Sequence, residues 1–150
     1  MINVLILAGG FGTRLLKVVK DIPKPMAPVN NQPFLGHQLK LINKSLTDYH
    51  VYVLTHHKSE IIERFVENMS NVSVIKESKP LGTGGAIKHA LQKINDNKSK
   101  ILVLNGDSYV DTDFSKFINE SKGDINILCC KQDNCDRFAT VELNNNLICR

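Results

Sequence analysis

A glycine-rich stretch near the N-terminus has the residue types of a phosphate-binding loop. It runs Leu7-Ala8-Gly9-Gly10-Phe11-Gly12-Thr13-Arg14-Leu15 and follows an apolar run over residues 1–6. Glycine has no Cβ and adopts positive φ, so this backbone can lie close to a ligand, and amides directed into one concavity bind an anion. The guanidinium of Arg14 can meet a phosphate with two hydrogen bonds. We therefore expect a phosphate cradle at the carboxyl end of a first strand.

Two well-known phosphate loops do not match this stretch. The P-loop requires a lysine directly after its last glycine, whereas Thr13 follows Gly12 here. The dinucleotide-binding fingerprint Gly-x-Gly-x-x-Gly requires a third glycine, and Leu15 stands in its place. A glycine-rich turn that binds no ligand stays open as the alternative.

A proline-rich segment follows and holds a lysine. Residues 21–30 contain prolines at positions 23, 25 and 28, and Lys24 lies between the first two. Prolines this close together exclude a helix and predict an extended path. A lysine on such a stiff segment is held in place, which suits a side chain that meets a triphosphate. A solvated loop lysine is the alternative.

Together, segments 7–15 and 23–26 resemble the signature of the sugar-1-phosphate nucleotidylyltransferases, also called nucleotide-sugar pyrophosphorylases. Segment 21–30 is most similar to the D-glycero-D-manno-heptose 1-phosphate guanylyltransferase branch. The resemblance runs along nearly all 150 residues and implies a Rossmann-like, glycosyltransferase-A-like nucleotidyltransferase fold. It also implies Mg²⁺-dependent transfer of a nucleotidyl group from a nucleoside triphosphate, GTP in this branch, to a sugar 1-phosphate. Heptose 1-phosphate is the expected acceptor, and mannose, glucose and N-acetyl amino sugar 1-phosphates stay open.

The segment from Glu77 to Ala86 resembles the part of this family that recognises the base. Gly82 and Thr83 fall in its Leu-Gly-Thr motif, and Glu77 matches a position that contacts the base edge in relatives. A carboxylate can accept hydrogen bonds from both the ring N–H and the exocyclic amine of guanine, which favours GTP. The alternatives are a surface glutamate and, for Thr83, a helix N-cap.

Asp107 lies in the segment Asn105-Gly106-Asp107-Ser108, directly after an apolar run. In the family, the aspartate of this segment binds the catalytic Mg²⁺. A carboxylate oxygen is the ligand that Mg²⁺ prefers, with phosphates and water completing its shell. An aspartate in a turn at the end of a strand is the alternative.

The resemblance assigns catalysis to Arg14, Lys24 and Asp107. Arg14 would bind the triphosphate, Lys24 would neutralise the α-phosphate or the incoming sugar phosphate, and Asp107 would be the metal ligand. The expected nucleotide-binding residues are Leu7, Ala8, Gly9, Gly10, Gly12, Thr13, Arg14, Glu77, Gly82 and Thr83.

The family continues with a lysine for the sugar phosphate and a second metal ligand. Neither residue is recognisable after Val141. We therefore expect residues 1–150 to form a nucleotidyltransferase domain that lacks its C-terminal acceptor-binding part.

Hydrophobic periodicity predicts an alternation of strands and helices. The strands are expected at 1–6, 51–54, 72–75, 101–104 and 125–129, and the helices at 33–46, 61–69, 83–94 and 114–121. Ser59 and Asp113 are the expected N-caps of the second and fourth helices, and a hairpin is expected within 138–149. This alternation indicates an α/β fold with a mostly parallel sheet and helices on both faces.

Composition narrows the class of protein. The chain is 42% hydrophobic with a formal net charge of +4, which is typical of a globular protein. No apolar run approaches a membrane span, and no signal peptide is recognisable, so we expect a cytoplasmic protein without a membrane partner. The lysines are scattered and no nucleic-acid motif accompanies them, so we expect no nucleic-acid partner. Histidines 56 and 57 are expected at the surface, with a place in the wall of the cleft as the alternative. A homo-oligomer stays open.

Two functions from other classes stay open. A dinucleotide-dependent oxidoreductase would use the same first turn, although the third glycine is missing. A non-catalytic nucleotide- or sugar-phosphate-binding regulatory module would keep the phosphate cradle and lose the metal chemistry.

Overall fold

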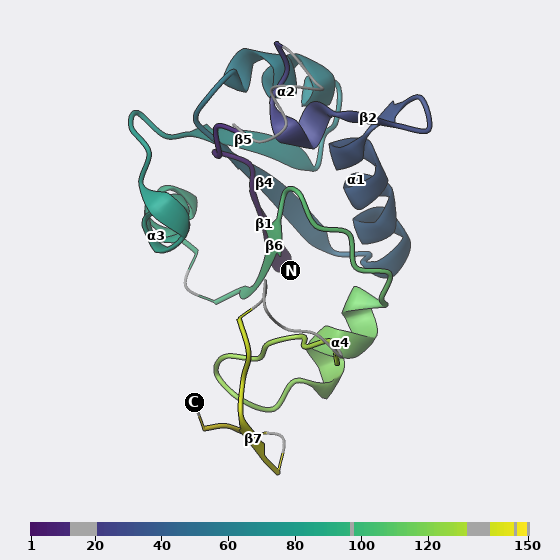
Figure 1. Ribbon diagram of the computed structural model, residues 1–150, viewed down its shortest axis with the longest axis vertical. Coiled ribbons are helices and arrows are strands. Elements are labelled where there is room, and N and C mark those ends of the chain that lie inside the picture. The colour runs from purple at the N-terminus through teal and green to yellow at the C-terminus, as the bar shows by residue number, and fades with distance from the viewer. Residues whose placement is uncertain (13–20, 97, 132–138, 146, 150) are drawn as a thin grey trace.

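The structure is a computed structural model that describes residues 1–12, 21–96, 98–131, 139–145 and 147–149. Its centre is a four-stranded sheet in the order β5-β4-β1-β6 (Figure 1). All pairings in this sheet are parallel. The strands are β1 (Ile2–Leu7), β4 (Tyr49–Thr55), β5 (Val72–Lys76) and β6 (Lys100–Asn105). The predicted parallel sheet is confirmed.

The register of the strands brings their carboxyl ends to one edge of the sheet. Leu7 at the end of β1 pairs with Leu54 of β4 on one side and with Asn105 of β6 on the other. Thr55 then pairs with Lys76 at the end of β5. Because ligands of open α/β sheets bind beyond the carboxyl ends of the strands, the segments that follow these residues are the first place to look for a site.

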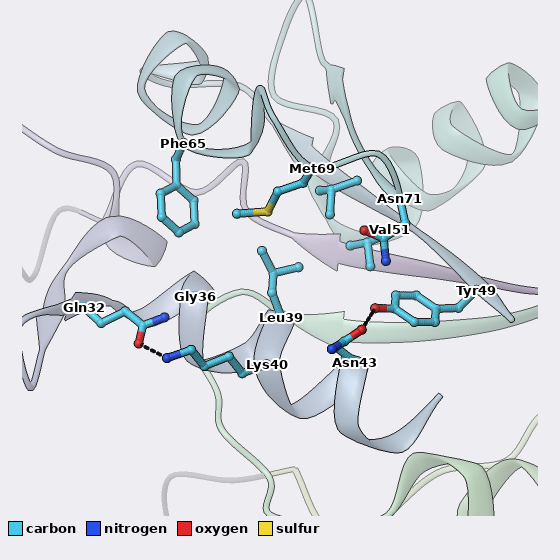
Figure 2. Close-up of a pocket in the computed structure, with 11 residues that line it drawn as sticks. Gln32, Gly36, Leu39, Lys40, Asn43, Tyr49, Val51, Phe65, Met69 and Asn71 are labelled. Atoms are coloured by element: carbon cyan, nitrogen blue, oxygen red, sulfur yellow. Dashed lines mark hydrogen bonds between the residues drawn. The ribbon is translucent and has the colours of Figure 1, made fainter. Parts of the chain in front are cut away.

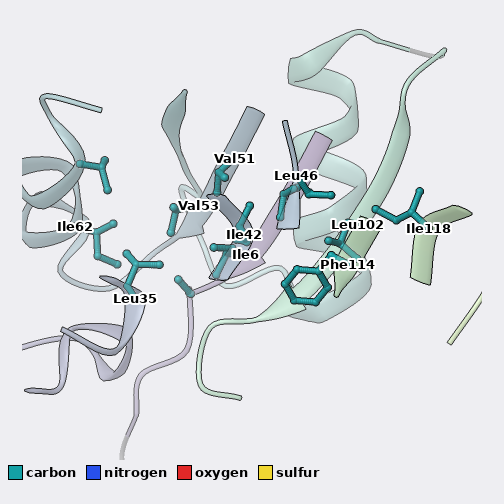
Figure 3. Close-up of a cluster of buried hydrophobic side chains, with 13 residues drawn as sticks. Ile6, Leu35, Ile42, Leu46, Val51, Val53, Ile62, Leu102, Phe114 and Ile118 are labelled. Atoms are coloured by element: carbon teal, nitrogen blue, oxygen red, sulfur yellow. The ribbon is translucent and has the colours of Figure 1, made fainter. Parts of the chain in front are cut away.

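Helices cover both faces of the sheet, as the periodicity predicts. The helices α1 (Phe34–Ser45), α2 (Ser59–Val66) and α4 (Phe114–Glu120) pack on one face, and α3 (Gly82–Ile94) packs on the other (Figure 1). Successive side chains of a strand point to opposite faces, so Val4 and Ile6 enter the larger core (Figure 3) while Leu5 enters the smaller one under α3.

The cover of the edge strand β6 is incomplete. Ile101 pairs with Asn3 and Val103 pairs with Leu5, so both side chains share the face on which α3 lies. However, α3 packs against β1 and β4, and Ile101 and Val103 are 37% and 40% exposed. Part of the sheet face on β6 is therefore apolar and open to solvent.

The proline-rich segment differs from the predicted extended path. Lys24–Met26 forms a short 3-10 helix, η1, in which the amide of Met26 donates to the Pro23 carbonyl at 2.8 Å. Proline is tolerated there because the first turn of a helix leaves its N–H groups unbonded. Two short antiparallel strands follow, β2 (Pro28–Val29) and β3 (Gln32–Pro33).

Two of the expected helix caps are wrong. The N-cap of α2 is Lys58, and Ser59 is the first helical residue, where its hydroxyl donates to Glu63 at 2.6 Å. The N-cap of α3 is Leu81, so Thr83 lies inside the helix and the N-cap alternative for Thr83 fails. Asp113 caps α4 as predicted, since its carboxylate accepts from the amide of Lys116 at 3.1 Å.

The strand expected at 125–129 is wrong. These residues form no strand, and Ile125, Ile127 and Leu128 are 86%, 56% and 48% exposed. An apolar run becomes a strand only where a neighbouring strand takes its backbone hydrogen bonds, and none does so in the described part of the chain. The hairpin is confirmed as β7 (Leu143–Asn144) and β8 (Leu147–Ile148), whereas residue 138 lies outside the described residues.

None of the helices among the described residues has the length and apolar composition that crossing a membrane requires.

Candidate functional site

A cavity of about 310 Å³ lies beyond the carboxyl ends of the strands. It is formed by the glycine-rich loop, the loop after β5, the first turn of α3 and the end of β6. The lining residues are Leu7, Gly9, Gly10, Phe11, Glu77, Pro80, Leu81, Gly82, Thr83, Ala86, Asn105 and Asp107. The structure thus brings together seven predicted site residues, namely Leu7, Gly9, Gly10, Glu77, Gly82, Thr83 and Asp107.

The glycine-rich loop runs from Glu77 toward Lys24. A Cβ at Gly9 would lie 3.0 Å from Oε1 of Glu77, so a larger residue there would crowd the carboxylate. Gly10 has no such neighbour within 4 Å and faces open space. Gly12 has a φ of +60°, which favours glycine, and its Cα is next to the stem of Lys24. The backbone at Gly10 therefore has open space beside it, as a phosphate cradle requires.

Four of the predicted loop residues are not among the described residues that line the cavity. Gly12 lies beside Lys24 instead. Ala8 is buried, and its amide donates to the Leu54 carbonyl at 2.8 Å, so that N–H serves the fold. Thr13 and Arg14 lie outside the described residues. Their part in nucleotide binding stays a prediction.

Glu77 is a buried residue, and the alternative of a surface glutamate is wrong. Its side chain is 5% exposed, and its Oε2 accepts from the amide of Leu81 at 3.0 Å. Its own amide donates to the Thr55 carbonyl at 2.7 Å, which joins the end of β5 to β4. A buried carboxylate is tolerated only where donors satisfy it. One oxygen therefore holds the loop before α3, and the other lies against Gly9 in the cavity wall.

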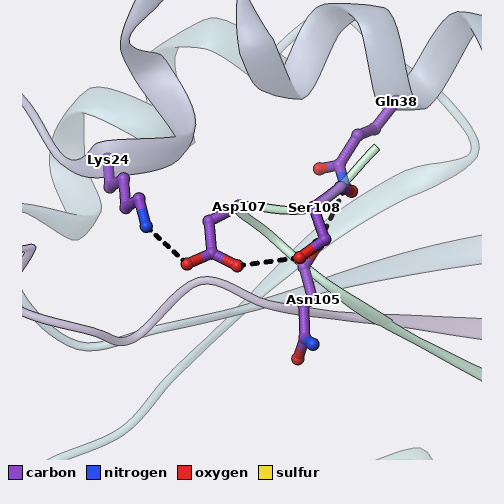
Figure 4. Close-up of polar contacts among 5 residues, drawn as sticks. All are labelled: Lys24, Gln38, Asn105, Asp107 and Ser108. Carbon is purple, nitrogen blue, oxygen red and sulfur yellow. Dashed lines mark hydrogen bonds and ion pairs between the residues drawn. The ribbon is translucent and has the colours of Figure 1, made fainter. Parts of the chain in front are cut away.

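Asp107 and Lys24 form an ion pair at the opposite end of the cavity. Nζ of Lys24 lies 2.6 Å from Oδ2 of Asp107, and the hydroxyl of Ser108 donates to Oδ1 at 3.3 Å (Figure 4). The hydrogen bond from Lys24 holds the pKa of Asp107 below its ordinary value, although partial burial acts in the opposite direction. The side chains of Lys24 and Asp107 are 39% and 44% exposed, so a ligand can reach both.

The backbone that carries Asp107 is fixed against β1. The amide of Gly106 donates to the Leu7 carbonyl at 2.9 Å. A Cβ at position 106 would come within 2.6 Å of that oxygen, closer than a real Cβ approaches any atom. Only glycine therefore allows this contact, which sets Asp107 directly beside the start of the glycine-rich loop.

Sequence reasoning missed Phe11 as a lining residue. Phe11 is 51% exposed, and its ring centroid lies 5.6 Å from that of His56 and 5.6 Å from that of His57. Both histidines are partly exposed, which agrees with the expected surface position, and neither is among the residues that line the cavity. Nδ1 of His56 lies 3.0 Å from the Glu77 carbonyl, which ties this aromatic group to the loop after β5. An aromatic residue between two glycines was the available signal.

A second cavity, of about 240 Å³, lies between α1 and α2 and contains none of the predicted site residues (Figure 2). Its apolar wall includes Leu39 and Met69. At its rim the ammonium of Lys40 donates to Gln32 at 2.6 Å, and the hydroxyl of Tyr49 donates to Asn43 at 2.9 Å. Among the described residues, its lining contains no carboxylate, whereas Glu77 and Asp107 line the first cavity.

Several characterised proteins are similar to this chain in sequence and in fold. The D-glycero-alpha-D-manno-heptose 1-phosphate guanylyltransferase of Campylobacter jejuni is 40% identical over 144 residues, which cover 93% of this chain and 62% of that protein. The enzyme of the same name from Aneurinibacillus thermoaerophilus is 36% identical over 143 residues, 91% of this chain and 61% of that protein. The chain thus spans about three-fifths of the length of these relatives.

Solved structures extend the likeness to three dimensions. HddC from Yersinia pseudotuberculosis, whose crystal structure is a complex with GMP-PN, matches with a TM-score of 0.68 and 39% identity. The match covers 79% of this chain and 53% of that one. The family model described as nucleotidyl transferase matches residues 3–147. The chain therefore belongs to the nucleotidyl transferase family.

Proposed function

We propose that this chain supplies the donor half of a guanylyltransferase that transfers GMP from GTP to D-glycero-D-manno-heptose 1-phosphate. The single observation that carries the proposal is the shared cavity, in which the glycine-rich loop, Glu77 and Asp107 come together. The similarity to two heptose 1-phosphate guanylyltransferases and to a GMP-PN complex supports the choice of GTP and of the acceptor.

Guanine recognition falls to the Glu77 side of the cavity. Glu77 keeps one carboxylate oxygen toward the cavity wall, and Gly82 leaves the first turn of α3 without a side chain beside it. A flat base can approach such a surface closely, and its donor edge needs the acceptor that Glu77 offers. Thr83, which also lines this end, completes the base-binding set.

Phosphate binding falls to the opposite end. The amides from Gly9 to Thr13 and the guanidinium of Arg14 would hold the triphosphate. Lys24, held against Gly12 on its short 3-10 helix, would neutralise the α-phosphate or the incoming sugar phosphate. The reacting groups are then positioned by stiff backbone rather than by long, free side chains.

The residues present fit a Mg²⁺ ion that the substrate helps to hold. Asp107 offers an ionised carboxylate in the cavity, and the described residues contain no cluster of three or more His, Cys, Asp or Glu side chains that would form a complete protein cage. Mg²⁺ is commonly bound through one or two carboxylates with phosphates and water as the other ligands. When bound, it would supply positive charge to the α-phosphate and the leaving pyrophosphate.

The reaction needs no protein nucleophile. An oxygen of the sugar phosphate attacks the α-phosphorus of GTP, the bond from that phosphorus to the bridging oxygen breaks, and pyrophosphate leaves. Lys24 and the loop amides hold the charge that grows on the phosphate oxygens, and Glu77 fixes the base so that the attack is in line. We propose that the residues that bind the acceptor belong to a part of the family fold that lies C-terminal to this nucleotidyltransferase domain. We also propose that the protein acts in the cytoplasm.

The experiment is a matrix of four nucleoside triphosphates against heptose, mannose, glucose and N-acetylglucosamine 1-phosphates, read by pyrophosphate release. GTP binding is measured in parallel by calorimetry. We expect the chain to bind GTP and to transfer GMP slowly, with heptose 1-phosphate as the best acceptor. Tight binding of NAD(H) without GTP binding would instead indicate the oxidoreductase, and GTP binding with no transfer under any condition would indicate the regulatory module.

A further inference from the structure

Gln38 is a polar residue on the buried face of α1. Leu35, Gln38 and Ile42 all point to the interior, and Gln38 is 4% exposed. An apolar side chain at this position would pack without any need for hydrogen bonds, whereas a buried amide destabilises the fold unless its partners satisfy it. The role of this glutamine therefore has to be found in its partners.

The amide nitrogen of Gln38 joins both ends of the turn that carries Asp107. Nε2 donates to the carbonyl of Asn105 at 2.8 Å and to that of Ser108 at 2.8 Å (Figure 4). Both partners are carbonyl oxygens, which only accept, so the nitrogen of the amide must face the turn. Inside the turn, the amide of Ser108 donates to the Asn105 carbonyl at 3.3 Å. Gln38 thus closes the turn from the side of α1.

The same turn is fixed from the side of β1 by Gly106, whose amide donates to the Leu7 carbonyl. Asp107 therefore lies between residues that are held from opposite sides. A cavity of about 310 Å³ borders Gln38, Asn105 and Ser108 and extends toward Phe114. The turn has room to shift into this space once the two bonds from Gln38 are lost.

The carbonyl oxygen of the Gln38 side chain, Oε1, is buried and lacks a hydrogen bond among the described residues, and this makes the burial of the residue unfavourable. Native proteins leave few buried polar atoms unsatisfied, and those that persist are often found where function requires an exception. The two donated bonds are the compensation, and both of them act on the turn of Asp107.

We propose that Gln38 is a positioning residue, whose amide holds turn 105–108 so that the carboxylate of Asp107 is presented to the divalent cation bound with the nucleotide. The proposal rests on the proposed function for the cation and the nucleotide. Gln38 itself touches neither, and it acts only through the backbone carbonyls of Asn105 and Ser108.

The test compares the parent chain with Gln38→Met, which keeps the length of the side chain and removes the donor. Binding of Mn²⁺ in the presence of GTP is followed by electron paramagnetic resonance, and binding of GTP without metal by calorimetry. Loss of a residue behind a metal ligand typically weakens metal binding on the order of 10–100-fold. We expect Mn²⁺ to bind at least about tenfold more weakly to Gln38→Met, with unchanged affinity for metal-free GTP.

Ile42→Val is the matched control, because Ile42 lies on the same buried face of α1 and makes no bond to the turn. It should keep the Mn²⁺ affinity of the parent. Equal Mn²⁺ affinity in the parent and Gln38→Met overturns the proposal. An equal loss in Gln38→Met and Ile42→Val also overturns it, because general core packing would then explain the effect.

A second measurement separates this proposal from the proposed function. If the parent binds no Mn²⁺ with GTP, the proposed function fails, and amide hydrogen exchange then decides the role of Gln38. Faster exchange at Gly106 and Ser108 in Gln38→Met, with Val53 unchanged, supports the positioning of the turn, and unchanged exchange overturns it. If Gln38→Met does not fold, Gly106→Ala, which displaces the same turn from the β1 side, is expected to show the same loss of Mn²⁺ affinity.

Discussion

The ammonium of Lys24 lies 2.6 Å from Oδ2 of Asp107, although 83 positions separate the two residues in the chain. The family resemblance predicts different ligands for them, phosphate for Lys24 and metal for Asp107. Without ligands, the two charges neutralise each other, so neither is left uncompensated in the cavity wall. A cation that binds Asp107 competes with Lys24 for the carboxylate and releases the ammonium toward the phosphates. Metal binding and lysine release would therefore be coupled.

Lys24→Met is expected to reduce GMP transfer by at least about tenfold, because a charge-assisted hydrogen bond to phosphate contributes on the order of 1.5–3 kcal/mol. The free energy of unfolding should change by less than about 1 kcal/mol, since the ion pair with Asp107 is partly exposed. Pyrophosphate release and urea denaturation measure the two effects. Lys40→Met is the control, because Lys40 lies outside the cavity that holds Asp107. If Lys24→Met transfers GMP as fast as the parent, Lys24 takes no part in the reaction.

Asp107→Asn should abolish metal-dependent transfer and leave the fold in place. An amide oxygen is neutral and is a poorer Mg²⁺ ligand than a carboxylate. The variant also loses the attraction to Lys24 but keeps the backbone bond from Gly106 to Leu7. Circular dichroism should match that of the parent. Retention of full Mg²⁺-dependent pyrophosphate release would contradict the metal role.

Glu77→Gln should narrow the preference for GTP over ATP. The amide keeps one acceptor, which can still bind the N–H of Leu81, but its NH₂ group would face the donor edge of guanine. Competition between GTP and ATP, measured by calorimetry, tests this expectation. Glu120→Gln on the exposed surface of α4 is the control. If Glu77→Gln keeps the GTP-to-ATP affinity ratio of the parent, Glu77 only stabilises the loop before α3 and does not recognise guanine.

Asp96 gives the clearest expected pH dependence of stability. A hydrogen bond from the Ser99 side chain, followed by those from the amides of Lys98 and Ser99, lowers its pKa from 3.8 to about 2. Because the folded pKa is the lower one, ionised Asp96 stabilises the fold above about pH 4, and this contribution is lost as the pH falls toward about 2.

The Asp96→Asn variant cannot titrate at this position. Its free energy of unfolding should therefore fall less steeply between about pH 4 and pH 2 than that of the parent, as followed by urea denaturation. Asp124→Asn, at an exposed position, serves as the control and should follow the parent curve. Parallel curves for the parent and Asp96→Asn would contradict the lowered pKa.

Sequence alone predicted the features that depend on local patterns. Apolar runs and helical spacing gave the four strands of the sheet and the four helices close to their observed bounds. The order of these elements then placed Glu77 and Asp107 at the same edge, because parallel strands end on the same side. The shared cavity of these residues was therefore within reach of the sequence.

Features that depend on distant partners were not predictable in this way. The apolar run at 125–129 looks like a strand, but strand formation depends on a neighbour that the run itself does not specify. Gln38 reads as an ordinary helical residue, and its partners lie 67 and 70 positions away. The cap of α2 was missed because Lys58 adopts a φ of 54°, which is uncommon for residues other than glycine, asparagine and aspartate.

The partly uncovered strand β6 also affects how the protein behaves at high concentration. Ile101 and Val103 expose apolar surface on β6, which is the outer strand of the sheet among the described residues. Such an edge is a template for pairing with a second molecule. Self-association of this chain is therefore expected to begin at β6, and a charged residue in place of Val103 would raise the concentration at which it starts.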